Sequence, residues 1–160
     1  MNLVNSQETY MLEAFRQAEI AFGRDEVPVG AVIVHEKKII SRAYNQVEML
    51  KDPTAHAEML AITQATNYLE SKWLNECTMY VTLEPCSMCA GALILSRIKK
   101  VVFGTFDPKT GAGGSVLNIL QHNKLNHAVE IENGIATEKC SAILSEFFKK
   151  KRQQKLISEN

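Results

Sequence analysis

Apolar and polar positions follow two different periods along the chain, and these periods divide it into helices and short strands. Apolar side chains recur every three to four residues over 6–22 and 53–70, which is the spacing of one helix face. A similar apolar face returns over 136–155. Short runs rich in β-branched and aromatic residues predict strands at 31–34, 39–44, 78–83, 99–104 and 128–131.

The predicted helices begin and end at residues that favour those positions. Ser6 offers a cap for the first helix, and Gly23 ends it. Asp52 or Thr54 can cap the second helix, and Pro53 suits its first turn.

A further helix is predicted over about 85–96, with Pro85 at its first helical position. It lies between two predicted strands, and a strand–helix–strand succession implies parallel pairing of those strands. The helix is apolar on nearly every face. We therefore expect the sheet to cover one side of it and a second subunit to cover the other.

Composition places the chain among ordinary globular proteins. Its 160 residues are 46% hydrophobic and 22% charged, and they show no internal repeat, low-complexity tract or linker. We expect one domain over 1–160, with a basic C-terminal helix at about 136–155. The 18 basic and 18 acidic residues cancel, so a nucleic-acid partner would have to be held by local basic patches.

The sequence gives no sign of a membrane or an export pathway. No apolar run reaches the roughly 18–20 residues of a membrane span. The N-terminus lacks the basic and apolar regions of a signal peptide. Four cysteines are too few for a disulfide scaffold, which favours the cytoplasm.

Two short segments carry the candidate chemistry: His56-Ala57-Glu58 and Pro85-Cys86-Ser87-Met88-Cys89. His56, Cys86 and Cys89 are three ligands, the number that a catalytic zinc site uses when its fourth position stays open for water. Glu58 can face that water as a proton carrier without binding the metal. This pattern is the signature of zinc-dependent nucleobase deaminases.

Two other interpretations of the cysteine pair stay open. Cys86 and Cys89 could form a redox dithiol, although such a pair needs no His-x-Glu upstream. They could also belong to a structural zinc site in a binding module without chemistry. That site needs a fourth ligand, for which Cys77 or Cys140 are candidates, but neither has a paired spacing.

Three other features bear on ligand binding. Asn45 is either a turn residue or an amide that reads a base edge. The glycine-rich segment 107–115 lacks the lysine-serine pattern of a P-loop, so we expect a flexible loop at the rim of the site, followed by a short helical turn at 117–120. The basic run 149–152 is either a solvated helix end or a phosphate-binding surface.

The chain resembles the bacterial tRNA-specific adenosine deaminases of the cytidine-deaminase-like superfamily, from about Glu13 to Arg152. His-Ala-Glu with Pro-Cys-x-x-Cys is shared by the whole superfamily. Ser96-Arg97-Ile98, the Asp-x-Lys-x-Gly loop and the basic C-terminal helix favour the tRNA branch. The segments that carry the resemblance are 26–31, 53–58, 82–92, 96–98 and 107–115.

The resemblance implies a three-layer α/β/α cytidine-deaminase-like fold with a five-stranded mixed sheet, in a single CMP/dCMP-type deaminase domain. It also implies one zinc ion per subunit, a cytoplasmic homodimer, and hydrolytic conversion of the wobble adenosine of tRNA to inosine. The implied substrate is the anticodon stem-loop of an arginine tRNA with an ACG anticodon, and no other protein partner is implied. The alternative is a deaminase of a free base or nucleoside, such as guanine or cytosine.

The resemblance further implies roles for residues around the site. Asn45 would bond the adenine edge with help from the Ala57 backbone, while Val27 and Phe148 would line the pocket. Asp107 would meet the anticodon loop. The expected contacts with the tRNA backbone come from Lys109, Lys149, Lys150, Lys151 and Arg152.

Overall fold

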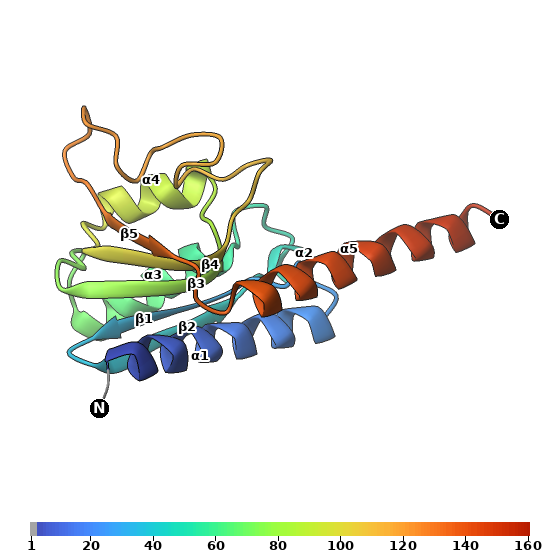
Figure 1. Ribbon diagram of the computed structural model, residues 1–160, viewed down its shortest axis with the longest axis horizontal. Helices are drawn as coiled ribbons and strands as arrows, with labels where there is room; N and C mark the ends of the chain where they lie inside the picture. Colours follow the sequence, from blue (N-terminus) through green and yellow to red (C-terminus); the bar gives the residue numbers. More distant parts are fainter. Residues whose placement is uncertain (1–2) are drawn as a thin grey trace.

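The computed structural model describes residues 3–160, and within them five strands form one sheet in the order β2-β1-β3-β4-β5 (Figure 1). β1 pairs antiparallel with β2 and β3, whereas β3, β4 and β5 are parallel. The predicted five-stranded mixed sheet is confirmed. The strands are β1 Gly30–His35, β2 Lys38–Tyr44, β3 Cys77–Leu83, β4 Lys100–Thr105 and β5 Glu130–Asn133.

Helices cover both faces of the sheet, which gives the expected three layers (Figure 1). α1 and α5 pack on one face, and α3 packs beside α4 on the other. Alternate residues of β1 divide between two cores: Val32 and Val34 pack with α1, while Ile33 faces the α3 side. The helices are α1 Leu3–Gly23, α2 Val47–Leu50, α3 Ala57–Leu69, α4 Ser87–Leu95 and α5 Thr137–Ser158.

The β1–β2 hairpin forms without the Asn-Gly pair that tight turns favour. Glu36 and Lys37 both have positive φ, at 50° and 63°. Two consecutive positive φ values define a turn whose twist matches that of the flanking strands. The hairpin therefore joins the two strands that the apolar pattern predicts at 31–34 and 39–44, although its turn residues are not the usual ones.

Three predicted helix starts were wrong. α1 begins at Leu3, so Ser6 lies within the helix and is not its cap. The other two starts are those of α3 and α4. α3 begins at Ala57 with His56 as its N-cap, because Asp52 is used to close a turn with the backbone and hydroxyl of Thr54. α4 has Cys86 as its N-cap, so Pro85 precedes the cap and is not the first helical residue. Both shifts move the predicted metal ligands to the ends of the helices.

The chain between β4 and β5 also departs from expectation. The predicted helical turn at 117–120 is absent, because Asn118 pairs with Gly113 in an isolated bridge. The last strand begins at Glu130, two residues later than predicted. Sequence patterns did not indicate the short helix α2 at all.

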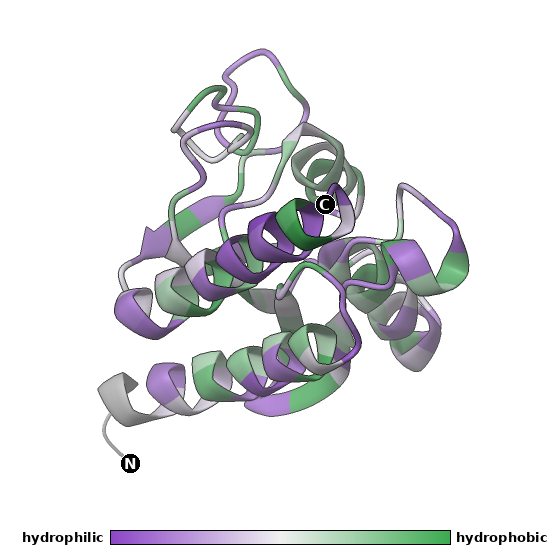
Figure 2. Cartoon of the chain, turned by 90° about the vertical axis from the view of Figure 1, so that its right-hand side faces the viewer, coloured by the Kyte–Doolittle hydropathy of each residue, from purple (hydrophilic) through white to green (hydrophobic). Residues whose placement is uncertain are grey.

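α5 extends well beyond the rest of the molecule at its C-terminal end (Figure 1). Seen from that end, the helix is mainly hydrophilic along its length (Figure 2). Among the described residues, no helix is both long enough and apolar enough to cross a membrane.

Candidate active site

The three predicted metal ligands meet where two helices begin. His56 is the N-cap of α3, Cys86 is the N-cap of α4, and Cys89 lies in the first turn of α4. His56 Nδ1 is 3.6 Å from Cys86 Sγ and 3.5 Å from Cys89 Sγ. The three ligand atoms all lie within 4.8 Å of one another.

These distances fit a zinc ion. A tetrahedral zinc with usual bond lengths to nitrogen and sulfur separates those two atoms by about 3.6 Å. One imidazole and two thiols are also the donor set that zinc prefers. Cys77 opens β3 at the other end of the strand, and Cys140 lies in α5, so neither joins the cluster.

The pKa values of the two thiols of the cluster shift in opposite directions. The pKa of Cys86 falls to about 4 because its thiolate accepts a hydrogen bond from Cys89 and another from His56. Donation to Cys86, together with burial, raises the pKa of Cys89. The hydrogen bond to Cys86 likewise raises the pKa of His56. A metal ion bound at this position would release protons from its thiol ligands.

Glu58 is the acid of the site. Its side chain is buried, with 4% of the residue exposed, in the first turn of α3. Burial raises the pKa of its carboxyl, while His56 and a hydrogen bond from Cys89 act in the opposite direction. A carboxyl with a raised pKa beside a metal site is suited to carrying protons near neutral pH.

Asn45 connects the end of β2 with the start of α3. Its backbone N–H donates to Val29 O, and its Oδ1 accepts the backbone N–H of Ala57 at 2.7 Å. The amide thus caps α3 from a distance, in place of the side-chain cap that His56 does not supply. No hydrogen-bond partner of its Nδ2 is found in the part of the chain that the structure describes.

Glu84 is a site residue that the sequence patterns did not single out. Its buried carboxylate accepts hydrogen bonds from the backbone N–H groups of Asp107, Gly113 and Ser115 and from the Ser115 hydroxyl, over 2.5–3.1 Å. The loop 107–115, expected to be flexible, is thereby held against the segment that carries Cys86. The only available signal was an acidic residue directly before Pro85.

The side chain of Asp107 shapes the same loop. Its carboxylate accepts hydrogen bonds from the backbone N–H groups of Lys109 and Thr110 and from the Thr110 hydroxyl. This turn leaves Lys109 exposed.

The other predicted contacts fall in two places: Val27 precedes β1, whereas Phe148 and the basic run 149–152 lie on α5. Val27 is half-buried and packs on the core of the α3 side. Phe148 is exposed and stacks edge-on against Phe147. Lys151 forms a 2.5 Å ion pair with Asp25.

The other residues of the basic run differ in their surroundings. Lys150 lies over the ring of Phe22. Lys149 and Arg152 are exposed.

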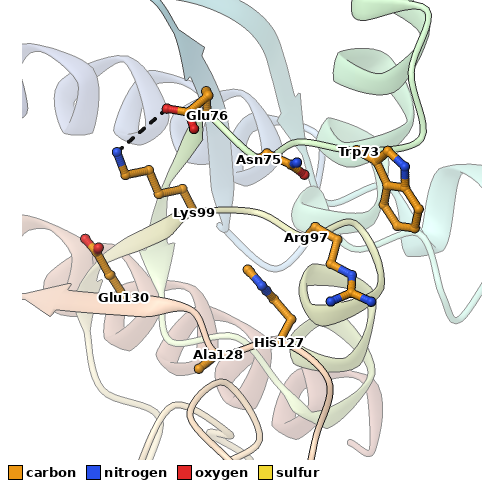
Figure 3. A pocket seen from close by; sticks show the side chains of 8 residues that line it. All are labelled: Trp73, Asn75, Glu76, Arg97, Lys99, His127, Ala128 and Glu130. Atoms are coloured by element: carbon orange, nitrogen blue, oxygen red, sulfur yellow. Dashed lines mark ion pairs between the residues drawn. The ribbon is translucent and has the colours of Figure 1, made fainter.

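A cavity of about 610 Å³ lies at the opposite end of the sheet, near the starts of β3, β4 and β5 (Figure 3). Arg97 lies there over the ring of Trp73 and donates to Asn126 O. None of the predicted site residues lines this cavity.

The fold and the metal-ligand cluster with its buried acid define the protein as a deaminase, and the MafB19-like deaminase family model matches residues 5–152. A tRNA-specific adenosine deaminase of Aquifex aeolicus is 56% identical over 146 residues, which are 91% of this chain and 96% of that protein. The chain belongs to the family of tRNA-specific adenosine deaminases.

Two further comparisons agree with this assignment. The tRNA-specific adenosine deaminase of Bacillus subtilis is 47% identical, over 95% of this chain and 94% of that protein. A structure solved in a study of A-to-I editing by tRNA:A34 deaminases superimposes with a TM-score of 0.82 at 39% identity, covering 85% of this chain and 99% of that one.

Proposed function

We propose that the protein deaminates adenosine 34, the wobble adenosine of tRNA, to inosine. The observation that carries this proposal is a buried acid, Glu58, beside a three-ligand cluster that fits zinc. The names of the relatives supply the substrate, since they are tRNA-specific adenosine deaminases at 39–56% identity. They do not favour the alternative of a free-base or nucleoside deaminase.

We propose His56, Cys86 and Cys89 as the ligands of one zinc ion per chain. When bound there, zinc acts as a Lewis acid that lowers the pKa of water toward about 7 and so supplies a nucleophile at neutral pH. The protein holds its three ligands on the first turns of two helices, where backbone N–H groups favour thiolates.

Glu58 carries the protons of the reaction. Water adds to C6 of adenine, and Glu58 accepts a proton from that water and delivers it to the ring nitrogen beside C6. The carboxylate then takes the proton of the hydroxyl now bonded to C6 and passes it to the amino group. The C6–N bond breaks, ammonia leaves, and the C6 oxygen becomes the carbonyl of inosine. The net change is adenosine plus water giving inosine plus ammonia, so the carboxyl ends in the state in which it began.

Substrate contacts come from groups around the cluster. The Nδ2 of Asn45 donates to the adenine edge, and the start of α3 at Ala57 approaches the base with it. Val27 and Phe148 line the path of the nucleotide. In a duplex the stacked base would be inaccessible, whereas an unpaired anticodon loop presents it at a small cost.

The RNA strand on either side of the base meets charged groups of the loop 107–115 and of α5. Asp107 and Lys109 lie on the loop that Glu84 holds beside Cys86. The run Lys149, Lys150, Lys151 and Arg152 offers further charges to the phosphates of the anticodon stem-loop, and an exposed lysine serves as a point charge there.

The assembly proposed is a homodimer of one CMP/dCMP-type deaminase domain, residues 1–160, in the cytoplasm. Leu95 is the last residue of the apolar helix α4, and it is 77% exposed. A second copy packed on this side of α4 would cover Leu95. The thiol cluster also requires reduced cysteines, which the cytoplasm provides.

The test is to incubate the protein with unmodified arginine tRNA bearing an ACG anticodon and to measure inosine at the wobble position. We expect conversion of that adenosine alone, and none when the same adenosine is paired in a duplex. Free adenosine, guanine and cytosine form the matched set for the alternative function. Efficient deamination of one of these, without conversion of the tRNA, would overturn the proposal.

A further inference from the structure

One buried carboxylate ties the glycine-rich loop to the segment that carries the metal ligands. Glu84 is only 2% exposed, and its two carboxylate oxygens accept four hydrogen bonds from the loop 107–115. Its own backbone N–H donates to Thr105 O, at the end of β4. The carboxylate thus lies between β3 and the loop, two residues before Cys86.

The loop is shaped around this carboxylate. A Cβ added to Gly111 would lie 2.3–2.5 Å from the Glu84 carboxyl atoms, which is too close for any other residue. Gly111 also pairs with Cys86 in an isolated bridge, and Ala112 N–H donates to Pro85 O at 2.8 Å. The glycines of the loop therefore allow its backbone to approach Glu84 and the ligand segment closely.

The loop also carries two charged residues that are not buried, Asp107 and Lys109. Asp107 turns the loop through three hydrogen bonds, and Lys109 is exposed. Displacing the loop from Glu84 would move both residues relative to Cys86. The chemical cluster itself would keep its three ligands, since none of them contacts the Glu84 carboxylate through a hydrogen bond among the described residues.

We infer that Glu84 is a positioning residue. It fixes the loop 107–115 in the position in which Asp107 and Lys109 contact the RNA strand beside the target base. This inference rests on the proposed function, because it assigns the loop to an RNA substrate. A role in substrate placement raises KM, whereas a role in the chemical step lowers kcat.

The test compares Glu84→Gln with Glu26→Gln. In Glu84→Gln one oxygen becomes an NH₂ group, which cannot accept from a backbone N–H. Glu26 is the matched control, since it is also buried and accepts the N–H groups of Glu48 and Met49 at the start of α2. Both variants replace a buried carboxylate with an amide, but Glu26 contacts α2 and not the loop 107–115.

Hydrogen exchange measures directly how well the hydrogen bonds to Glu84 protect the backbone amides of the loop. We expect Glu84→Gln to speed exchange of the Gly113 and Ser115 amides by about tenfold or more, because they lose a buried acceptor. Glu26→Gln should do the same at Glu48 and Met49 and leave the first pair unchanged. Equal exchange of Gly113 and Ser115 in wild type and Glu84→Gln would overturn the inference.

Steady-state kinetics with an anticodon stem-loop test whether Glu84 acts in substrate binding. For Glu84→Gln with full zinc content we expect KM to rise about tenfold and kcat to change less than about threefold. A lower kcat at constant KM in folded, fully zinc-loaded Glu84→Gln would instead place Glu84 in the chemical step and overturn the inference. If Glu84→Gln does not fold, Ser115→Ala removes one of the four hydrogen bonds and should raise KM by a smaller factor.

A double-mutant cycle with Lys109→Gln separates positioning from general stability. If Glu84 acts through the loop, its effect on kcat/KM shrinks when Lys109 is already lost, whereas independent effects would add and overturn the inference. A wild-type protein inactive on the stem-loop would overturn both the proposed function and the RNA role. An active wild type with unchanged Glu84→Gln kinetics would overturn only the role of Glu84.

Discussion

Glu58 lies two residues after His56, on the first turn of α3, and its carboxyl is buried beside the cluster. We predict that Glu58→Gln keeps one zinc per chain and lowers the rate of inosine formation by at least about 10²–10⁴, the usual loss when a general acid–base group is removed. Metal analysis and single-turnover inosine formation measure the two effects. A variant that lost zinc but kept its activity per bound zinc would contradict the role given to Glu58.

Asn45 has one group for the fold and one for the substrate. Its Oδ1 caps α3 through Ala57 N–H. Asn45→Ala should therefore destabilise the protein by about 1 kcal/mol, as the loss of a capping acceptor does. Asn45→Asp keeps an acceptor near a helix N-terminus but loses the Nδ2 donor.

We predict that Asn45→Asp retains the melting temperature of the wild type and raises KM for the anticodon stem-loop. Thermal unfolding and steady-state kinetics provide the two readouts. If both variants lose stability and neither changes KM, Asn45 acts only as a cap of α3 and does not bind the substrate.

At the residue scale, the sequence predicted the cluster because its chemistry is carried by few residue types at fixed spacing. His56, Cys86 and Cys89 come together as expected. Glu84 was not predicted, because a carboxylate that accepts hydrogen bonds from backbone groups over twenty residues away has no local pattern. The hydrogen bond by which Asn45 caps α3 at Ala57 was not predicted for the same reason.

At the scale of elements, the apolar periods located the principal helices and strands but misplaced the helix starts. Asp52 and Pro53 are a local start signal, yet Asp52 closes a turn with Thr54 and the helix begins at Ala57. The start is decided by tertiary contacts, namely the amide of Asn45 and the packing of α3 on β1 and β2. The later start places His56 at the helix end, which faces the cysteines.

α5 gives a prediction that belongs to an element. Its exposed basic residues Lys149 and Arg152 should contact phosphates, and each lost contact should flatten the dependence of log affinity on log salt by about 0.7–0.9. We predict this change for Lys149→Gln and Arg152→Gln in stem-loop binding measured from low to moderate salt. Lys37→Gln, in the hairpin turn at the other end of the sheet, is the matched control and should leave the slope unchanged.

A slope that Lys149→Gln and Arg152→Gln leave at the wild-type value would remove α5 from the RNA interface. Lys151 is a less suitable probe, because its ion pair with Asp25 would also be lost.

At the scale of the whole molecule, the order of the strands places the site. β3 and β4 are parallel, so the chain leaves β3 at the same end at which β4 delivers Thr105 and the loop that follows. The sequence predicted this parallel pair from the strand–helix–strand succession. It could not give the pairing of β1 with β3, because more than forty residues separate these two strands.

The proposed dimer is also a property of the whole molecule. We predict that Leu95→Glu shifts the protein from dimer to monomer, since it would bury an unpaired charge in the interface. Ile157→Glu, at a residue 76% exposed on the outer end of α5, is a control of equal exposure and should remain dimeric. Light scattering coupled to gel filtration gives the mass, and a wild-type monomer or a dimeric Leu95→Glu would contradict the proposed interface.

The most direct test of the account is zinc K-edge X-ray absorption on the purified protein, together with metal analysis. We predict one zinc per chain with two sulfur ligands at about 2.3 Å and two lighter ligands at about 2.0–2.1 Å, one of them from solvent. Cys77→Ser and Cys140→Ser should give the same spectrum, whereas Cys86→Ser should lose the metal. A third sulfur ligand, a shell filled by four protein groups, or a protein that binds no zinc would contradict the account.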